Sequence, residues 1–506
     1  MAFTVVSALR WWARECPERV ALWVDGEPMS YADLSAASAR VGAHLGALGV
    51  RTGDRIVTMA SNSMEYAVLA LGVVRIGAIF APISTHSSAR EIAQSLSALA
   101  PAVLFADAER QAIVREALGG APTPALRDLR EIRSQLETSE PIPILSHEPA
   151  EDDPIFIIRT SGSTGPPKGV VETHRTVVAY SAEFVLMQPR CGSGASALVV
   201  GPFSSSSGTL LLMQFVVAGN TIYLEKRFEP QRALKLLANY RITIFLAASV
   251  FFERIAALND FVAADLSGLY FSQIGGSRIP ASLIATWQRK GVILRQAYGC
   301  TEAGGAWAAG DDTATSAPDK CGHGAMFTDF AVRAEGGGFA AAGVPGEILI
   351  RGPSQMPGYW QNPDETSTAI KAGWLHTGDL GVVDENGNLT VIDRIKDIII
   401  SGGLNIAARE LENVIAEVSG VEEVAVIGVA DADFGETPLA VVHGDPDVLS
   451  EAMIVDYCAK QLARYKIPRY VVLTPELLPR LPSGKISKVE LRKRYRDSAM
   501  ALPKVR

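Results

Sequence analysis

Cysteine is scarce in this sequence, and its few copies follow no familiar ligand or disulfide spacing. The chain of 506 residues has five cysteines, none in a C-x-x-C pair or beside a histidine cluster. This pattern supports neither a zinc site nor a disulfide framework, so we expect a cytoplasmic protein with reduced thiols. Residues 1–20 lack the basic start and apolar core of a secretory signal, and we expect no export.

An excess of positive charge is also missing, as is a long unbroken apolar run. Lys and Arg total 47 against 55 Asp and Glu, a net charge of −8, which argues against a nucleic-acid partner. The most apolar stretch, residues 66–83, is interrupted by Arg75, Pro82 and glycines. It therefore predicts buried helix or strand and no membrane span. The length and the 48% hydrophobic content indicate a globular protein with more than one domain.

Helical and strand patterns alternate through most of the chain. Helical periodicity over residues 33–48 and 230–240 separates short apolar runs, which lie at 54–59, 77–83, 221–224 and 242–246. This rhythm predicts layered α/β sheets with buried parallel strands. After residue 334 the sequence changes to Gly-rich turns and short strands, with a hairpin turn at 384–387.

We therefore predict an α/β fold with two domains. Residues 1–393 are expected to form a large N-terminal domain of layered α/β sheets plus a small β unit. Residues 394–506, about 110 in all, are enough for a separate small α+β domain.

The strongest local motif directly follows the apolar run 155–158. It comprises Thr160, Ser161, Gly162, Ser163, Thr164, Gly165, Pro166, Pro167, Lys168 and Gly169. The glycines let the backbone approach an anion, the hydroxyls can donate to phosphate oxygens, and Lys168 adds positive charge. A Ser/Gly linker is the alternative, but linkers seldom follow a buried strand so abruptly. The motif is no Walker P-loop, because Pro167 precedes Lys168 and no Ser or Thr follows it.

This loop resembles the hallmark loop of the adenylate-forming superfamily, which contains acyl-CoA synthetases, peptide-synthetase adenylation domains and firefly luciferase. Four further blocks resemble that superfamily in the same order along the chain. They are Tyr298-Gly299-Cys300-Thr301-Glu302, residues 374–379, residues 394–397 with 401–406, and Pro482-Ser483-Gly484-Lys485. The blocks span most of the sequence, which most resembles a stand-alone acyl- or aryl-CoA ligase.

The resemblance implies a two-step ligase reaction that uses ATP, Mg²⁺ and CoA. A carboxylic acid would be activated to acyl-AMP with release of pyrophosphate, and the acyl group would then pass to the thiol of CoA. Lys485 would contact the carboxylate and the α-phosphate, Thr301 the α-phosphate, and Glu302 would hold Mg²⁺. Because attack on the α-phosphate brings two anions together, such neutralisation is chemically required. Outside this context, a lysine in a Gly-Lys turn is usually a solvated surface residue.

Other positions match the nucleotide and hinge residues of the superfamily. Asp379 corresponds to the residue that accepts both ribose hydroxyls, with Arg394 assisting at the nucleotide. Adenine would pack against Gly275-Gly276-Ser277, and Tyr298 and Gly299 belong to the same nucleotide-binding set. Lys396 occupies the hinge about which a mobile C-terminal domain, carrying the catalytic lysine, would swing after adenylation.

The expected acyl pocket departs from the pattern common in CoA ligases. After Phe203, Ser205 stands where a histidine is frequent, and Ala247 and Ala248 replace a frequent Gly-Val. With Gly275 beside them, these small side chains predict room for a bulky or aromatic acid.

The acceptor side shows departures as well. Gly402 and Gly403 would leave a narrow tunnel for the pantetheine arm of CoA, or simply form a turn before a helix predicted over 407–418. Leu404 replaces a frequent Glu, and Ala408 a frequent Pro. An amine acceptor, a carrier-protein thiol, and nitrite activation with an arylamine acceptor therefore stay open as alternatives. A nucleotide-binding regulatory protein without catalysis is disfavoured, because such a protein would not need all four charged residues Glu302, Asp379, Arg394 and Lys485.

Overall fold

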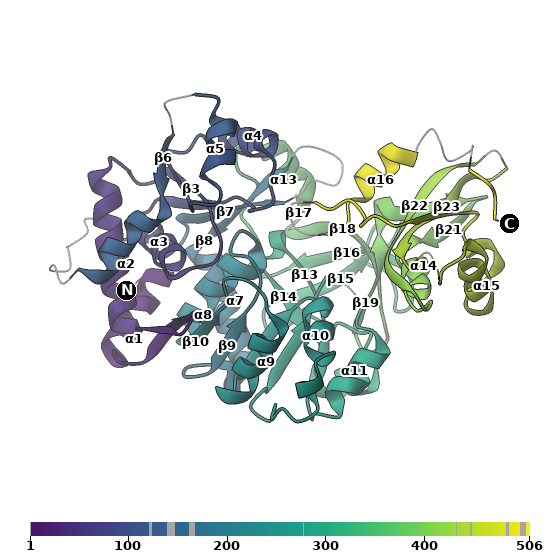
Figure 1. The fold of residues 1–506 in the computed structure, drawn as a ribbon, viewed down its shortest axis with the longest axis horizontal. Helices are drawn as coiled ribbons and strands as arrows, with labels where there is room; N and C mark the ends of the chain where they lie inside the picture. The colour runs from purple at the N-terminus through teal and green to yellow at the C-terminus, as the bar shows by residue number, and fades with distance from the viewer. Residues whose placement is uncertain are drawn as a thin grey trace. The chain divides into compact units, whose positions relative to one another are not determined.

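The computed structural model describes residues 2–120, 124–138, 147–160, 167–276, 278–431, 433–445, 448–481, 485–495 and 502–505. These residues divide into two compact units (Figure 1). Unit 1 holds the described residues up to Phe330 together with Ile350–Leu375, and unit 2 holds Ala331–Leu349 and the described residues from His376 onward. The α/β class is confirmed, whereas the mobile domain beginning at residue 394 stays a prediction.

A six-stranded sheet in unit 1 has the order β6-β5-β3-β4-β7-β8. Its strands are β3 (Arg55–Met59), β4 (Ile79–Pro82), β5 (Val103–Ala106), β6 (Ala125–Asp128), β7 (Pro154–Thr160) and β8 (Lys168–Thr173). All neighbours pair in parallel except the β7–β8 hairpin. Val57 and Ile157 pack with α4 (Ala89–Leu99) and α5 (Gln111–Leu118), whereas Ile56 and Phe156 join the cluster on the other face. Such alternation is the two-residue period of strands buried on both faces.

An eight-stranded sheet in unit 1 has the order β14-β13-β12-β11-β9-β10-β1-β2. Its strands are β1 (Val20–Val24), β2 (Glu27–Ser30), β9 (Ser196–Val199), β10 (Thr221–Leu224), β11 (Ile244–Ala247), β12 (Phe271–Ile274), β13 (Leu294–Cys300) and β14 (Gly305–Ala308). The six central strands are parallel, and β2 and β14 close the two edges antiparallel. The carboxyl ends of the central strands therefore share one edge, where α/β sheets bind ligands.

Helices cover both sheets of unit 1. One core cluster joins the two sheets through α1 (Val5–Glu15), α2 (Tyr31–Ala47), α3 (Met64–Arg75), α7 (His174–Met187) and α8 (Leu211–Ala218). The other face of the eight-stranded sheet is covered by α9 (Pro230–Asn239), α10 (Ser249–Ala256) and α11 (Ala281–Gln288). Shorter helices are α6 (Arg133–Glu137), α12 (Asp311–Ser316) and α13 (Pro363–Ala369).

The apolar stretch 66–83 forms most of α3 and all of β4, as predicted. Every residue of α3 except Glu65 is buried, because the helix lies inside the main core. In the described part of the chain, no helix combines the length and apolar character needed to cross a membrane.

Unit 2 contains the C-terminal α+β part and most residues of a five-stranded sheet, of which the strand Ile370–Lys371 belongs to unit 1. β15 (Asp329–Arg333), β16 (Gly346–Arg351), β17 (Ile370–Lys371), β18 (Trp374–Val383) and β19 (Leu389–Arg394) form a sheet in the order β15-β16-β18-β17, with β19 beside β18. The predicted hairpin turn at 384–387 connects β18 to β19.

A second sheet of unit 2 has the order β21-β20-β23-β22, with β24 beside β23. Its strands are β20 (Ile398–Ser401), β21 (Leu404–Ala407), β22 (Val421–Asp431), β23 (Gly435–Gly444) and β24 (Tyr470–Thr474). Val426 and Ala440 pack with α14 (Ala408–Ile415) and α15 (Glu451–Gln461), whereas Ile427 and Val441 pack with α16 (Lys488–Tyr495) on the opposite face.

Candidate active site

The β7–β8 hairpin carries the two ends of the predicted phosphate loop. Thr160 ends β7 and pairs with Lys168, the first residue of β8. The predicted loop residues between them lie outside the described residues; they are Ser161, Gly162, Ser163, Thr164 and Gly165. Gly169 is needed next to Lys168, because a Cβ there would stand 2.7 Å from Ile157 and 3.3 Å from Trp360.

Lys168 already has charged and aromatic partners in unit 1. Its Nζ forms an ion pair with the Glu365 carboxylate on α13. The same ammonium lies 5.0 Å from the centroid of the Tyr359 ring, within cation–π range. The lysine is therefore held at the start of β8 by residues from a distant segment.

Residues 358–360 lie alongside β8 and bond to its backbone like a short antiparallel strand. The Trp360 amide donates to the Gly169 carbonyl at 2.7 Å, and the Val171 amide donates to the Gly358 carbonyl at 3.2 Å. These backbone bonds hold Tyr359 beside Lys168.

The end of β13 presents Thr301 and Glu302 in a short 3₁₀ turn, Thr301–Ala303. The Tyr359 hydroxyl donates to Glu302 Oε1 at 3.0 Å, and the Thr301 and Ser206 hydroxyl oxygens lie 3.4 Å apart. Burial raises the pKa of Tyr359 well above its usual range, and the nearby Glu302 carboxylate adds to this effect. Tyr359 is therefore a neutral donor that orients Glu302.

A glycine earlier in this block has a steric reason. A Cβ on Gly299 would stand 2.1 Å from the Gly305 carbonyl oxygen of β14, so no larger residue fits. The neighbouring Tyr298 is buried and packs edge-on against Phe330 at a centroid distance of 5.9 Å. Both residues shape the end of β13, and neither carries charge to the site.

Glu172 is a second carboxyl group behind this turn, on β8. It is fully buried, and its Oε2 accepts a hydrogen bond from the Thr176 hydroxyl at 2.6 Å, while Oε1 has no partner in the described structure. Burial raises the pKa of Glu172 to about 8, opposed by the Thr176 bond and assisted by the negative charge of Glu302. This shift favours the uncharged form of Glu172 at neutral pH.

The predicted adenine and acyl segments lie at the carboxyl edge of the eight-stranded sheet. Ala247 ends β11 and pairs with Ile274, the last residue of β12, so Ala248 and Gly275 leave the sheet side by side. Gly276 has φ +85°, and a Cβ built on Gly275 or Gly276 meets no atom within 4 Å. Ser277 lies outside the described residues.

The serine tract after β9 leads into the turn that precedes α8. Phe203 is fully buried, and its ring packs on Tyr66 at a centroid distance of 5.0 Å. The Ser205 hydroxyl donates to the Pro202 carbonyl at 2.8 Å. Residues Ser206–Leu210 form a π-helical turn, a feature common at functional sites.

A small, mainly apolar cavity lies between α7, α8 and β11 in unit 1. Its lining residues include Tyr180, Phe184, Leu211, Gln214 and Leu246. Gln214 Nε2 donates to the Gly304 carbonyl at 3.1 Å, which ties the wall of this cavity to the turn that carries Glu302.

In unit 2, Asp379 and Arg394 face each other on the β18–β19 hairpin. They are register partners, and Arg394 Nε lies 3.2 Å from Asp379 Oδ1. The Asp379 side chain is 13% exposed and that of Arg394 is 51% exposed. The aspartate is therefore fixed while the guanidinium stays accessible to a ligand.

Glu347 of β16 braces the block before Asp379. Its carboxylate lies 2.8 Å from His376 Nδ1 and accepts the Gly378 amide at 3.3 Å. The Thr377 hydroxyl donates to the Ile348 carbonyl at 2.8 Å and accepts the Asp379 amide at 3.1 Å. These bonds fix the backbone that presents Asp379.

Lys485 lies in a turn whose Leu481 amide donates to the Lys485 carbonyl at 2.7 Å. Much of the residue is exposed, but its ammonium is partly desolvated, and this lowers the pKa of Lys485. Arg394 and Arg409 lower the pKa further, whereas Asp379 opposes them. The structure thus brings Lys485 within electrostatic range of Asp379 and Arg394.

Lys396 belongs to the 3₁₀ turn Ile395–Asp397 that follows β19. Burial lowers the pKa of Lys396, and Arg394 lowers it further, while Asp397 raises it. Arg492 of α16 forms a 2.7 Å ion pair with Asp397. The turn after the hairpin is thereby attached to the last helix of unit 2.

Gly402 and Gly403 form the turn between β20 and β21, with φ of +57° and +81°. A Cβ on Gly402 would stand 2.9 Å from the Phe434 ring, and a Cβ on Gly403 would meet no atom within 4 Å. The predicted turn is confirmed, and Gly402 packs closely against Phe434.

Glu302 could bind Mg²⁺ together with the phosphates of a bound nucleotide. Within the described residues, no group of three or more His, Cys, Asp or Glu side chains could hold a metal. Glu302 is a single accessible carboxylate, and Mg²⁺ is commonly bound by one carboxylate together with substrate phosphates. A metal that arrives with ATP suits this site better than a resident ion.

Tyr359, Glu365, Glu172 and Glu347 were not recognised as site residues from the sequence. The first two belong to Gly358-Tyr359-Trp360 and Pro363-Asp364-Glu365, where an aromatic pair precedes a helix start. A charged residue inside the apolar strand β8 was the available signal for Glu172.

Comparisons with known proteins agree with this arrangement. A family model described as AMP-binding enzyme matches residues 9–360, and one described as AMP-binding enzyme C-terminal domain matches residues 410–485. The long-chain-fatty-acid–CoA ligase FadD13 of Mycobacterium tuberculosis is 33% identical over 488 residues, which cover 92% of this chain and 93% of that protein. A feruloyl-CoA synthase of Amycolatopsis sp is 33% identical over 491 residues, covering 96% and 97%.

Solved structures share the fold over nearly the whole chain. ATP-bound MatB from Rhodopseudomonas palustris has a TM-score of 0.87 at 26% identity, covering 98% of this chain and 99% of its own. The o-succinylbenzoate CoA synthetase MenE from Bacillus subtilis, in complex with its acyl-adenylate intermediate, has a TM-score of 0.87 at 26% identity, covering 96% and 97%.

Proposed function

Since the chain belongs to the family of AMP-binding, adenylate-forming enzymes, we propose that it is an AMP-forming acyl-CoA ligase. It joins a carboxylic acid to the AMP part of ATP, releases pyrophosphate, and transfers the acyl group to the thiol of CoA. The observation that carries this proposal is the Glu302–Tyr359–Lys168 group at the loops of unit 1, together with Asp379, Arg394 and Lys485 in unit 2.

Unit 1 supplies the groups that bind the triphosphate. The Thr301 hydroxyl donates to the α-phosphate, and Lys168 with the loop after Thr160 binds the outer phosphates. Glu302 and the phosphate oxygens hold Mg²⁺, which neutralises charge on the phosphates when it is bound. Tyr359 keeps the Glu302 carboxylate oriented through its 3.0 Å hydrogen bond.

Unit 2 supplies the ribose contacts and the catalytic cation. Asp379 accepts hydrogen bonds from the ribose hydroxyls, and Arg394 donates to the nucleotide. The Lys485 ammonium donates to the oxygens of the carboxylate and the α-phosphate, where negative charge accumulates as the new bond forms. The attacking carboxylate oxygen must be held in line with the leaving pyrophosphate, while the ammonium neutralises the charge on the surrounding oxygens.

The second step uses the Gly402 and Gly403 turn. Two residues without side chains let the pantetheine arm of CoA approach the acyl-AMP. The thiol sulfur forms a bond to the acyl carbon, the bond from that carbon to the AMP oxygen breaks, and the thiol proton is released. Lys396 is the proposed hinge between the two steps.

For the acid, we propose a bulky or aromatic class. The support is the small residues at the carboxyl edge of the eight-stranded sheet, Ala247, Ala248 and Gly275. A relative named for feruloyl-CoA fits this class, whereas FadD13 is named for long-chain fatty acids.

The test is a product analysis in two parts. Acid-dependent exchange of pyrophosphate into ATP is first measured with a panel of aromatic and aliphatic acids, which reports adenylation alone. Each accepted acid is then incubated with ATP, Mg²⁺, CoA and a pool of amines, and the products are identified by mass spectrometry. We expect exchange with aromatic acids and a CoA thioester as the product.

Other outcomes separate the alternatives. An amide product would make the chain an amide synthetase, and acyl-AMP that accumulates in the presence of CoA would indicate a carrier-protein acceptor. Nitrite-dependent exchange would indicate a diazotising relative. ATP binding with no exchange for any acid would overturn the ligase proposal.

A further inference from the structure

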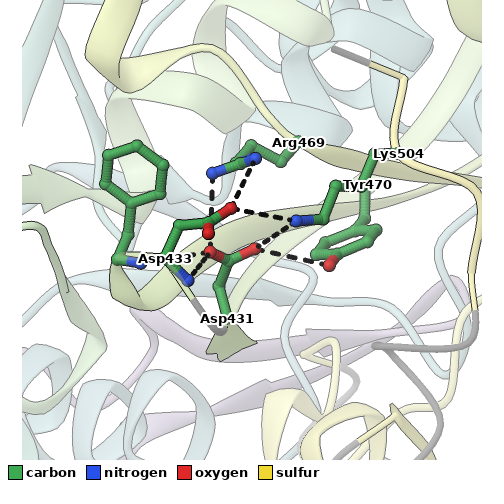
Figure 2. A network of polar contacts seen from close by, with 6 residues as sticks. Asp431, Asp433, Arg469, Tyr470 and Lys504 are labelled. Carbon is green, nitrogen blue, oxygen red and sulfur yellow. Dashed lines mark hydrogen bonds and ion pairs between the residues drawn. The ribbon is translucent and has the colours of Figure 1, made fainter.

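A polar network in unit 2 stands apart from the residues used above. Figure 2 shows Asp431, Asp433, Arg469, Tyr470 and Lys504 pointing toward one another. Arg469 lies 3.4 Å from both Asp431 and Asp433, and Lys504 Nζ lies 3.4 Å from Asp431 and 3.3 Å from Asp433. The Tyr470 hydroxyl donates to Asp431 Oδ2 at 3.4 Å. Two cations thus face two carboxylates.

Asp431 is the fixed centre of this network. Its side chain is 0% exposed, and its Oδ1 accepts the backbone amides of Asp433 and Phe434 at 2.9 and 3.1 Å. Burial opposes ionisation, but the two amides and the cations Arg469 and Lys504 outweigh it, so the pKa of Asp431 is lowered. The ionised carboxylate fixes the backbone amides of Asp433 and Phe434.

The same segment holds the Gly402 turn. The Gly402 amide donates to the Phe434 carbonyl at 2.9 Å, and the Phe434 ring lies against the Gly402 backbone. The Arg469 guanidinium lies 4.6 Å from the centroid of that ring. Asp431, Arg469 and Phe434 therefore connect Lys504 to the glycine turn by direct contacts.

Lys504 is itself anchored to the sheet. The neighbouring Val505 amide donates to the Arg469 carbonyl at 3.0 Å, and the Val505 side chain packs against the core beneath α14 and α15. Leu502 packs on the opposite face of the sheet, with α16. The ammonium is thereby held in place at the two aspartates.

We propose that Lys504 is a positioning residue for acyl transfer, because it holds Asp431 and Asp433, and Asp431 in turn holds Phe434 against the Gly402 turn. This inference rests on the proposed function, in which Gly402 and Gly403 admit the thiol. Adenylation uses Lys485 and the β18–β19 hairpin, so it does not depend on this segment. Lys504 does not touch the reacting atoms; it acts through the turn.

The experiment separates the two half-reactions in Lys504→Ala. Acid-dependent pyrophosphate exchange measures adenylation, and single-turnover reaction of preformed acyl-AMP with CoA measures transfer. We expect unchanged exchange, and transfer slowed about fivefold with a raised KM for CoA, because misplacement of a contact near the reacting groups costs rate steeply. Lys504→Arg restores transfer, and Lys460→Ala, an exposed lysine of α15, changes neither half-reaction.

A second readout does not depend on activity. Hydrogen exchange of the Gly402 amide, which is bonded to Phe434, is expected to be faster in Lys504→Ala and in Asp433→Asn than in the wild type and in Lys460→Ala. The inference would be overturned if Lys504→Ala slowed pyrophosphate exchange and acyl transfer equally, or if acyl transfer were unaffected. An unchanged hydrogen-exchange rate of the Gly402 amide in Lys504→Ala would also overturn it, even if the wild type makes no thioester. If the wild type makes no thioester but this rate rises in Lys504→Ala, only the proposed function is overturned.

Discussion

At the candidate site, Lys168 and Glu302 of unit 1 are held by neighbouring side chains, whereas Arg394 and Lys485 of unit 2 remain partly exposed. Lys168 is bound to Glu365 and covered by Tyr359, which in turn holds Glu302. In unit 2, Arg394 is 51% exposed. Lys485 is also exposed, and it lies close enough to Arg394 for their charges to interact.

Under the proposed function, we expect the two units to supply different parts of the chemistry. Paired groups cost little to organise when a ligand binds, so under the proposed function we expect unit 1 to act as a prepared binding site for the triphosphate. Accessible cations are stabilised by an anion that forms during the reaction, so unit 2 carries the larger rate effect. Substitutions in the two units should therefore change different kinetic constants.

The largest effect is expected from Lys485→Ala. Loss of the ammonium removes the group that stabilises charge at the α-phosphate, so acid-dependent pyrophosphate exchange should fall by about 100-fold or more. ATP binding, measured by calorimetry, should change little. The matched control is Lys493→Ala, an exposed lysine of α16. Retained exchange in Lys485→Ala would remove that lysine from the mechanism.

Glu302→Gln should have the next largest effect. The amide cannot replace the negative charge that binds Mg²⁺, so exchange should fall by about 30-fold and require more Mg²⁺ for half-maximal rate. Tyr359→Phe removes only the orienting hydrogen bond and should show the same trend more weakly. A Glu302→Gln enzyme with an unchanged Mg²⁺ requirement would contradict the assigned role.

Glu365→Gln tests whether pairing in unit 1 prepares the site. Lys168 loses the partner that holds it at the start of β8, so the KM for ATP should rise by about fivefold while kcat changes less. Exposed Glu116→Gln on α5 is the control. A lower KM for ATP would mean that Glu365 competes with phosphate for the lysine.

The smallest effect concerns Glu172 and stability. Between the ordinary pKa of 4.5 and the raised pKa of about 8, the folded chain keeps a proton that the unfolded chain has released. The free energy of unfolding therefore falls as pH rises through this range, and Glu172→Gln removes that loss. The apparent Tm of the variant should exceed that of the wild type by about 3 °C at pH 8, and match it near pH 5.

Thermal unfolding followed at several pH values checks this effect. Glu116→Gln serves again as the control and should follow the wild type throughout. A difference that is independent of pH would show that packing, and not ionisation of Glu172, separates the two proteins.

The sequence predicted elements and single motifs well, because their signals are local. Periodicity located α2, α9, β3 and β10, and the turn residues located the β18–β19 hairpin. The pairing of Lys168 with Glu365 could not be predicted in this way, because 197 residues separate the two and only the fold brings them together. The contacts of Lys504 were missed for the same reason, since no local pattern links it to Asp431.

In the proposed reaction, this chain transfers an acyl group through an acyl-adenylate. The most direct measurement uses an accepted acid labelled with ¹⁸O in its carboxylate, with mass spectrometry of the phosphorus products after complete turnover with CoA. Attack of the carboxylate on the α-phosphate places the label in AMP, and this is the result that we predict. Label in inorganic phosphate, with ADP as the nucleotide product, would show an acyl phosphate and contradict the account.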